Sequence, residues 1–281
     1  MMIRRFELDD DDVGKARGPM TTEPAVGDPM VEYRDVWKAF DHPVLAGVTL
    51  TVGRGETLSV VGHSGTGKSV LLKTTIGLIA PDQGDVVIDG QSVFSGGREA
   101  LDRCRRKVGY VFQNAALFDS MTVFENVAQG LSDRDQRKLG EKELVRRVVD
   151  ALEHVNLDAT KVLGKLPSEL SGGMRKRVGI ARAIVGRPEI LLYDEPVTGL
   201  DPVNATVVHR LIAQLAEEMG ITSILVTHDI EGALPISDRV ALLDHGQVRF
   251  VGTPDEFRNS TDALVRAFLE RDVPDDQELL V

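Results

Sequence analysis

The stretch Ser59-Val60-Val61-Gly62-His63-Ser64-Gly65-Thr66-Gly67-Lys68-Ser69-Val70-Leu71-Leu72 decides the fold. An apolar run leads into a glycine-rich loop, and a second apolar run that suits a helix leads out of it. Gly62, Gly67, Lys68 and Ser69 match G-x-x-x-x-G-K-[ST], in which glycines let successive backbone N–H groups turn towards one anion. We expect Lys68 to reach the β- and γ-phosphates of a nucleotide and the Ser69 hydroxyl to bind Mg²⁺. The stretch therefore predicts a nucleotide-binding loop between a strand and a helix.

Composition limits the classes of protein to which the chain can belong. Its 281 residues, 42% of them hydrophobic, suffice for one large domain or one domain with a subdomain. A net charge of −11 argues against a general nucleic-acid binder. The single cysteine, Cys104, excludes an intramolecular disulfide and a cysteine-built zinc site, and suits a reducing cytosol. Without an apolar run long enough for a membrane span, or the apolar core of a signal peptide, we expect a soluble chain that meets a membrane only through a partner.

The order of apolar and polar segments predicts alternating strands and helices. Residues 1–29 contain the acidic run Asp9–Asp12 and several Gly and Pro residues, which predicts a disordered acidic leader. The strands that we expect cover residues 31–37, 44–52, 57–61, 84–89, 108–112, 189–193, 221–227, 239–243 and 247–251. The helices that we expect cover residues 68–79, 101–106, 203–219 and 254–269, and the first should stop at Pro81.

Residues 121–163 interrupt this alternation with a helical pattern. Leu144, Val148, Ala151, Leu152 and Val155 recur at spacings of three and four, which is typical of the buried face of an amphipathic helix. We interpret the block as an inserted helical subdomain. After it, Ser171 is a natural N-cap for a helix that continues through residues 175–185. A capped, glycine-rich helix start can bind an anion as the first loop does.

Strands that alternate with helices imply a mainly parallel sheet covered on both faces, with ligands bound beyond the carboxyl ends of its strands. The glycine-rich loop, Gln113, Asp194-Glu195 and His228 all follow expected strands, so we expect them to converge at one edge. Asp194 suits the Mg²⁺-positioning carboxylate of a phosphate-loop enzyme, and Glu195 is placed to orient an attacking water. We expect His228 to contact the γ-phosphate and Gln113 to reach the metal or the water.

Together these residues resemble the nucleotide-binding domain of an ABC (ATP-binding cassette) protein over residues 31–268. The motifs match in order: an aromatic A-loop residue, Walker A, the Q-loop, the signature Leu170-Ser171-Gly172-Gly173, Walker B, the D-loop and the switch histidine. The resemblance implies an α/β P-loop NTPase core with a mainly parallel sheet, an N-terminal antiparallel β subdomain and an inserted α-helical subdomain, about residues 115–185, that carries the signature. We expect the ATPase domain to span residues 30–268 and an acidic tail to span residues 269–281.

In this family, two cassettes close head to tail around two ATP molecules, each held between the Walker A of one copy and the signature of the other. The resemblance therefore implies a dimer with ATP and Mg²⁺ as cofactors, and Glu195 and His228 imply hydrolysis. The nucleotide-binding residues that it implies are Phe40, stacked on adenine, with Gly62, His63, Ser64, Gly65, Thr66, Gly67, Lys68, Ser69 and Val70. Ser171, Gly172 and Gly173 would contact the ATP of the partner copy, and Asp201 would form the D-loop. The catalytic set would be Glu195, His228 and Gln113, and the metal ligands Ser69, Gln113 and Asp194.

Within the family, the chain is similar to the ATPases of MCE-linked lipid transporters of the Mla type. Val70 follows the Walker serine where threonine is common, and Met174 stands at the usual glutamine of the signature, followed by Arg175-Lys176-Arg177. This likeness implies an integral-membrane permease, an MCE-type substrate-binding protein and, in some branches, a small STAS-domain subunit. It places the chain on the cytoplasmic face of the inner membrane.

Two other functions are compatible with the sequence. The cassette barely touches cargo, so an importer of amino acids or another polar solute would carry the same motifs. An ABC ATPase of translation or DNA maintenance is a more distant alternative, because such proteins carry two cassettes, a long coiled coil or zinc-binding insertions. They also need a basic surface, which the net charge of −11 disfavours.

Overall fold

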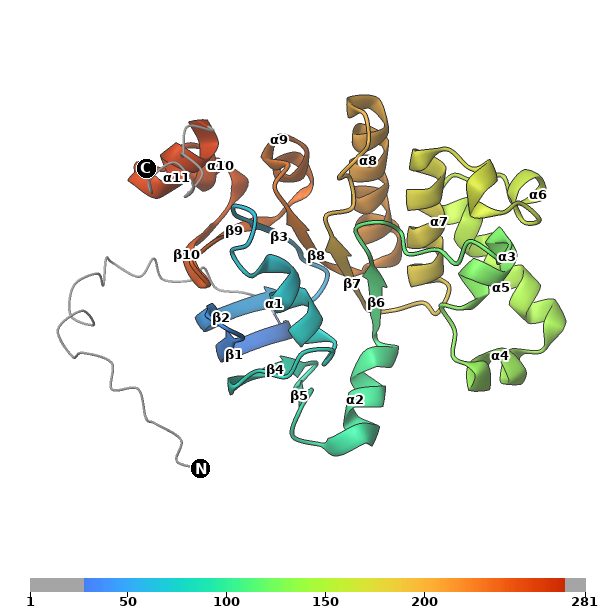
Figure 1. The fold of residues 1–281 in the computed structure, drawn as a ribbon, viewed down its shortest axis with the longest axis horizontal. Helices are drawn as coiled ribbons and strands as arrows, with labels where there is room; N and C mark the ends of the chain where they lie inside the picture. The colour runs from blue at the N-terminus through green and yellow to red at the C-terminus, as the bar shows by residue number, and fades with distance from the viewer. Residues whose placement is uncertain (1–27, 271–281) are drawn as a thin grey trace.

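The computed structural model describes residues 28–270, which fold around two β-sheets (Figure 1). The smaller sheet has the strand order β2-β1-β4-β5, and all of its neighbouring strands are antiparallel. Its strands are β1 (Pro29–Ala39), β2 (Pro43–Gly53), β4 (Gln83–Ile88) and β5 (Gln91–Ser92). This sheet confirms the expected N-terminal antiparallel β subdomain.

The larger sheet has the order β10-β9-β3-β8-β7-β6. All neighbours from β9 to β6 are parallel, and only β10 joins its neighbour antiparallel. Its strands are β3 (Thr57–Val61), β6 (Val108–Val111), β7 (Ile190–Asp194), β8 (Thr222–Thr227), β9 (Arg239–Asp244) and β10 (Gln247–Gly252). The mainly parallel sheet predicted from the alternation of elements is confirmed.

Both faces of this sheet are covered, as the apolar run in β7 shows. Leu192 packs in a core with the antiparallel sheet and α1 (Lys68–Thr75). Leu191 and Tyr193 point to the other side, into a core shared with α7 (Gly172–Ile184) and α8 (Pro202–Met219). Alternate residues of a strand face opposite ways, so a strand that is covered on both faces is apolar throughout.

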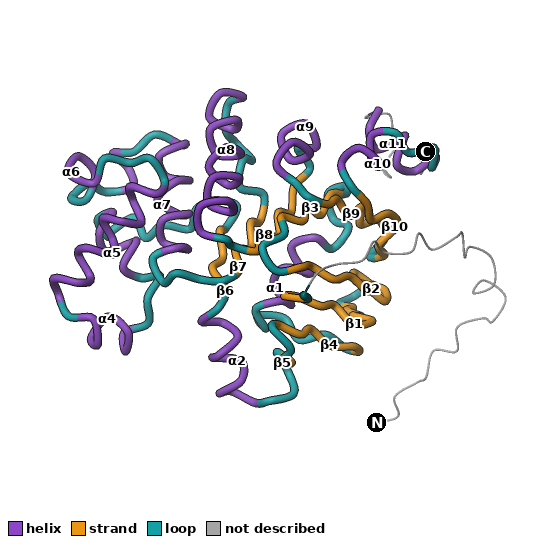
Figure 2. Tube along the Cα trace, turned by 180° about the vertical axis from the view of Figure 1, so that it is seen from behind, coloured by secondary structure: helices purple, strands orange, loops and turns teal. Residues whose placement is uncertain are grey.

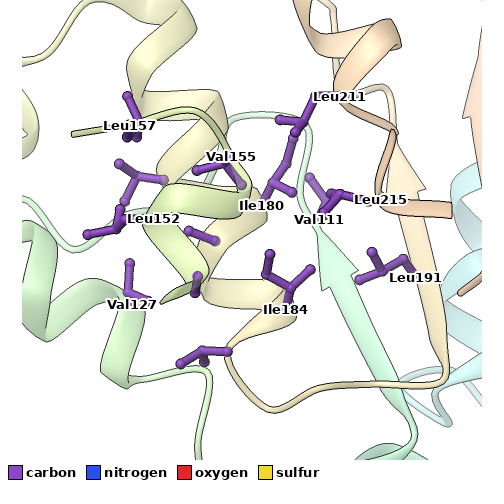
Figure 3. Packing of buried hydrophobic residues seen from close by; sticks show 14 of the residues in the cluster. Val111, Val127, Leu152, Val155, Leu157, Ile180, Ile184, Leu191, Leu211 and Leu215 are labelled. Carbon is purple, nitrogen blue, oxygen red and sulfur yellow. The ribbon is translucent and has the colours of Figure 1, made fainter. Parts of the chain in front are cut away.

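The helical subdomain lies beyond β6, at the opposite end of the molecule from α10 and α11 (Figure 2). Its helices are α3 (Val123–Ala128), α4 (Asp133–Leu139), α5 (Glu141–His154), α6 (Ala159–Val162), a 3-10 helix (Pro167–Glu169) and α7. The predicted face of α5 is confirmed, because Val148, Ala151 and Leu152 are buried. Figure 3 shows Leu152 and Ile180 in the same core as Val111 of β6, so the subdomain packs directly on the edge of the larger sheet.

The remaining helices flank the two sheets. They are α2 (Gly97–Arg106), α9 (Ile230–Ala233), a 3-10 helix (Leu234–Ile236), α10 (Pro254–Arg258) and α11 (Ala263–Glu270). Cys104 is buried on α2, and burial raises the pKa of its thiol, as expected for an unreactive cysteine. Among residues 28–270, no helix combines the length and the apolar character needed to cross a membrane.

The ends of the first helix and of the chain differ in part from the expectations. The helix expected over residues 68–79 was wrong at its C-terminus, because α1 ends at Thr75. Gly77 adopts the left-handed conformation (φ 64°), and the Leu78 N–H donates to the Lys73 carbonyl, which closes the helix well before Pro81. Most of the predicted acidic leader and tail, residues 1–29 and 269–281, lies outside the described residues; where they overlap, Pro29 opens β1 and α11 runs to Glu270.

The core of the helical subdomain gives the first prediction. Leu152→Ala should lower the free energy of unfolding by about 2–5 kcal/mol, because lost burial and an unfilled cavity add. Val145→Ala on the same helix should cost less than about 1 kcal/mol, since Val145 is 40% exposed. Urea denaturation followed by circular dichroism measures both values, and equal losses would contradict the placement of Leu152 in the core.

Candidate functional site

The glycine-rich loop joins the end of β3 to the start of α1 and lies tightly against β2. Gly67, which precedes α1, has φ 100°, in the left-handed region that side chains avoid. A Cβ atom there would lie 2.5 Å from the Val44 carbonyl oxygen. At Gly62 a Cβ atom would lie 2.2 Å from the Leu243 carbonyl oxygen. Both glycines of the motif are therefore required by the close approach of neighbouring backbone.

Lys68 is buried, and its ammonium group folds back over the loop. Its Nζ atom donates to the carbonyl oxygens of Gly62 and His63, each at 2.6 Å. Burial lowers the pKa of Lys68, and the charges of Glu195 and Asp194 raise it in opposition. The carboxylates thus help to keep a cation at the base of the loop, where a phosphate would need it.

Asp194, at the end of β7, is fixed by two hydroxyl groups. Ser69 Oγ donates to its Oδ1 at 2.7 Å, and the Tyr110 hydroxyl donates to its Oδ2 at 2.9 Å. Burial and the neighbouring Asp194 raise the pKa of Tyr110, so the phenol stays protonated as a donor. Ser69 and Asp194 come from different elements, yet they bring two hard oxygen donors to one point, the kind of ligand that Mg²⁺ prefers.

Glu195 follows directly and has an unusual backbone. Its φ of 50° is left-handed, and its N–H donates to the Val226 carbonyl oxygen at 2.9 Å. Strained backbone of this kind persists only where the surrounding structure enforces it, and it gathers at functional sites. The carboxylate is held as well, because Oε2 accepts from Thr198 Oγ1 at 3.1 Å and lies 2.8 Å from His228 Nδ1.

These groups border one large cleft of about 1290 Å³. The predicted residues that line it are Gly62, His63, Ser64, Gly65, Gly67, Lys68, Ser69, Val70, Gln113, Glu195 and His228. Asp194 does not line the cleft itself, but it is hydrogen-bonded to Ser69, which does. Thr66 stays within the loop, where its Oγ1 donates to the His63 carbonyl oxygen at 3.0 Å. The carboxyl ends of the parallel strands therefore bring the predicted groups together, as the sequence implied.

The other predicted residues lie away from this cleft. Phe40 is 58% exposed between β1 and β2, with the Lys38 ammonium 5.4 Å from its ring centre, and it does not line the cleft. Ser171 caps α7, as predicted, by accepting from the Met174 N–H at 3.3 Å. Asp201 caps α8 and accepts from the N–H groups of Val203 and Asn204.

Several cleft residues were missed by reasoning from the sequence. Thr198 holds Glu195, and His209 of α8 is buried against the cleft, 3.9 Å from Asp229. Phe268 of α11 also lines the cleft and meets the His63 ring edge-on at 5.1 Å between centres. The sequence did hold a signal for His209, because it lies on α8 at the helical spacing of the buried residues Ile212 and Leu215. Nothing local indicates that Phe268 returns to the loop.

Comparison with known proteins decides the family. A family model described as ABC transporter matches residues 45–198, more than half of the chain. The chain belongs to this family. It is the ATPase subunit of an ABC transporter, and its hydrolysis of ATP is coupled to transport.

Curated relatives of this cassette differ in the compounds that appear in their names. The sulfate/thiosulfate import ATP-binding protein CysA of Caulobacter vibrioides is 41% identical over 85% of the chain and 69% of the relative. The methionine import ATP-binding protein MetN of the same organism is 41% identical over 81% of the chain and 68% of the relative. The chloroplast protein TRIGALACTOSYLDIACYLGLYCEROL 3 of Arabidopsis thaliana is 38% identical over 92% of the chain and 79% of the relative.

Solved structures of other ABC cassettes share this fold. The chain is similar to cbiO1 of Clostridium perfringens, part of the transporter complex cbiONQ, with a TM-score of 0.75, 29% identity and coverage of 86% and 95% of the two chains. It is similar to the dimeric bacterial cassette MJ0796, with a TM-score of 0.73, 32% identity and coverage of 80% and 99%. Of these two neighbours, cbiO1 is described as part of a transporter complex and MJ0796 as a dimer.

The close packing of Gly67 generates the second prediction. Gly67→Ala should abolish ATP binding, because the added Cβ meets the Val44 carbonyl oxygen and the left-handed backbone is lost. Gly55→Ala is the matched control: Gly55 is also left-handed, but a Cβ atom there meets nothing within 4 Å. It should cost about 1 kcal/mol of stability and leave binding intact. Titration with a fluorescent ATP analogue distinguishes them, and equal binding by both variants would contradict the proposed constraint.

Proposed function

We propose that this ABC cassette energises lipid transport, and that Glu195 and His228 carry out its hydrolytic step. The observation that carries the hydrolytic assignment is the 2.8 Å contact between Glu195 Oε2 and His228 Nδ1 on the edge of the loop cleft. A carboxylate held by Thr198 and His228 has little freedom to rotate, so its second oxygen can orient a water towards a terminal phosphate. His228, with 62% of its side chain exposed, extends from Glu195 into the cleft, where its ring can contact that phosphate.

The remaining roles belong to the same proposal. Lys68 supplies the countercharge for the β- and γ-phosphates, with the N–H groups of residues 62–70 around them. The paired oxygens of Ser69 and Asp194 fit Mg²⁺, and Gln113 on the same cleft completes the proposed ligands. Mg²⁺ bound there would neutralise charge on the β- and γ-phosphates. Phe40 would stack on adenine, while Ser171, Gly172, Gly173 and Asp201 would face the nucleotide across the dimer interface.

The extent of similarity favours lipid as the cargo. The match to TRIGALACTOSYLDIACYLGLYCEROL 3, whose name is that of a glycolipid, spans 278 residues and 92% of the chain. The sulfate and methionine importers match over 242 and 230 residues. The lipid-transporter pattern at Val70 and Met174 adds to this difference. We therefore propose a permease, an MCE-type protein and a STAS-domain subunit as partners, with the cassette on the cytoplasmic face of the inner membrane.

A polar cargo is the second candidate. The importers CysA and MetN are slightly more identical to the chain, at 41% against 38%, although over a shorter span. The names of these two relatives give sulfate or thiosulfate and methionine as the imported compounds. The ATPase mechanism proposed above acts on the nucleotide and would serve either class of cargo.

The hydrolytic assignment gives the third prediction. Glu195→Gln should keep ATP binding but slow turnover by about a hundredfold or more, because the base that orients water is lost. The variant should accumulate as an ATP-bound dimer, visible by size-exclusion chromatography. Lys68→Ala should instead weaken ATP binding itself, since the phosphates lose a buried countercharge. Glu217→Gln on the exposed face of α8 is the control, and unchanged turnover in Glu195→Gln would remove Glu195 from its role.

The cargo gives the fourth prediction. Tagged Glu195→Gln protein, purified with ATP from gently solubilised membranes, should bring a multi-pass permease and an MCE-type protein, identified by mass spectrometry. The complex of the wild-type chain, rebuilt in lipid nanodiscs, should then hydrolyse ATP faster with added phospholipid than with sulfate or methionine. A soluble periplasmic solute-binding protein in the purified complex, with stimulation by the polar solute, would overturn the lipid assignment and leave the hydrolytic one intact.

A further inference from the structure

Three cations follow the signature on α7, and the structure separates them. Arg175 is exposed and donates to the Leu170 carbonyl oxygen at 2.6 Å, within its own turn. Arg177 is half-buried and donates to the Asn156 carbonyl oxygen at 2.7 Å, which ties α7 to the end of α5. Lys176 is buried, with 7% of the residue exposed, and its ammonium group donates to the carbonyl oxygen of Gln113. Of the three, Lys176 is the one that touches the predicted hydrolytic machinery.

The loop at residues 113–116, called here the Gln113 loop, rests on α7 at further points. Arg182 donates to the carbonyl oxygens of Ala115 at 2.6 Å and Ala116 at 2.7 Å. Both alanines are left-handed, with φ of 58° and 48°, so this backbone needs outside support. Gly179 supplies it by contact, because a Cβ atom there would lie 3.1 Å from the Ala115 Cβ. The Gln113 loop is therefore seated on the helix whose first turn carries the signature.

The contact between Lys176 and the Gln113 carbonyl oxygen is made by a buried ammonium group. A side chain without a donor at position 176 would remove this contact and leave Arg182 as the side chain of α7 that holds the Gln113 loop by hydrogen bonds.

We propose that Lys176 is a positioning residue for ATP hydrolysis, which holds the main chain at Gln113 to α7 so that Gln113 reaches the cleft only while the signature helix is in place. This inference rests on the proposed hydrolytic function. It makes α7 a rigid link between the signature, which faces the nucleotide of the partner copy, and Gln113, which faces the nucleotide of its own chain. A change at either nucleotide of the dimer would then act on the same helix, α7.

The fifth prediction separates positioning from mere stability by a split between kcat and KM. Lys176→Met removes the ammonium group at similar length and should lower the kcat of the purified full-length chain about tenfold or more. The KM for ATP and the binding of a fluorescent ATP analogue should stay within about twofold, because the loop around Lys68 is untouched. Lys176→Arg keeps a cation that can reach the Gln113 carbonyl and should restore most of the lost kcat.

The control is Arg177→Met, which removes a neighbouring cation of α7 that also binds a carbonyl group but does not contact the Gln113 loop. It should lower the melting temperature while keeping kcat near that of the wild type. A wild-type kcat in Lys176→Met, or a failure of Lys176→Arg to restore turnover, would overturn the inference. If Lys176→Met does not fold, the arginine variant and Lys176→Gln, which keeps a donor without the charge, decide the question. A wild-type chain without ATPase activity would instead contradict the proposed function.

Discussion

The buried charge of Lys68 is the interaction on which the rest of the site depends. A buried ammonium group needs partners, and the structure provides them from two directions: loop carbonyl groups on one side and the carboxylates that end β7 on the other. Those carboxylates are in place because β7 lies next but one to β3 in a parallel sheet. The order of the strands thus sets where the charged groups lie relative to one another. A phosphate chain that enters the cleft meets a cation whose position is already fixed.

Much of this arrangement followed from sequence because it depends on local rules. A strand, a glycine-rich turn and a helix need no long-range information, and the parallel sheet follows from regular alternation. The convergence of Gln113, Glu195 and His228 then follows from geometry, since carboxyl ends of parallel strands share one edge. The cap at Ser171 is equally local, because its hydroxyl group satisfies an N–H of the first turn of α7.

What the sequence did not reveal depends on contacts between distant segments. The early end of α1 comes from Gly77, which is a weaker signal in the sequence than Pro81. Phe268 contacts His63, although most of the domain separates the two residues in the sequence. The sequence shows three basic residues in a row, Arg175-Lys176-Arg177, with nothing to distinguish them. Only the way in which α7 packs against the Gln113 loop shows that Lys176 is the one that points into the protein. Phe40 lies outside the cleft of its own chain, so its expected role remains a proposal.

The site also explains why cargo is the hardest property to infer. The residues argued to act on the nucleotide are polar groups for a phosphate chain, and relatives named for sulfate, methionine or a glycolipid share the cassette at similar identity. Cargo must therefore influence the ATPase through elements that move the site rather than through groups that touch the phosphate. The Gln113 loop and α7 fit that need, because buried cations fasten one to the other. On the roles proposed above, a shift of either would move Gln113 relative to Glu195 across the cleft and so change the rate of hydrolysis without altering the chemistry.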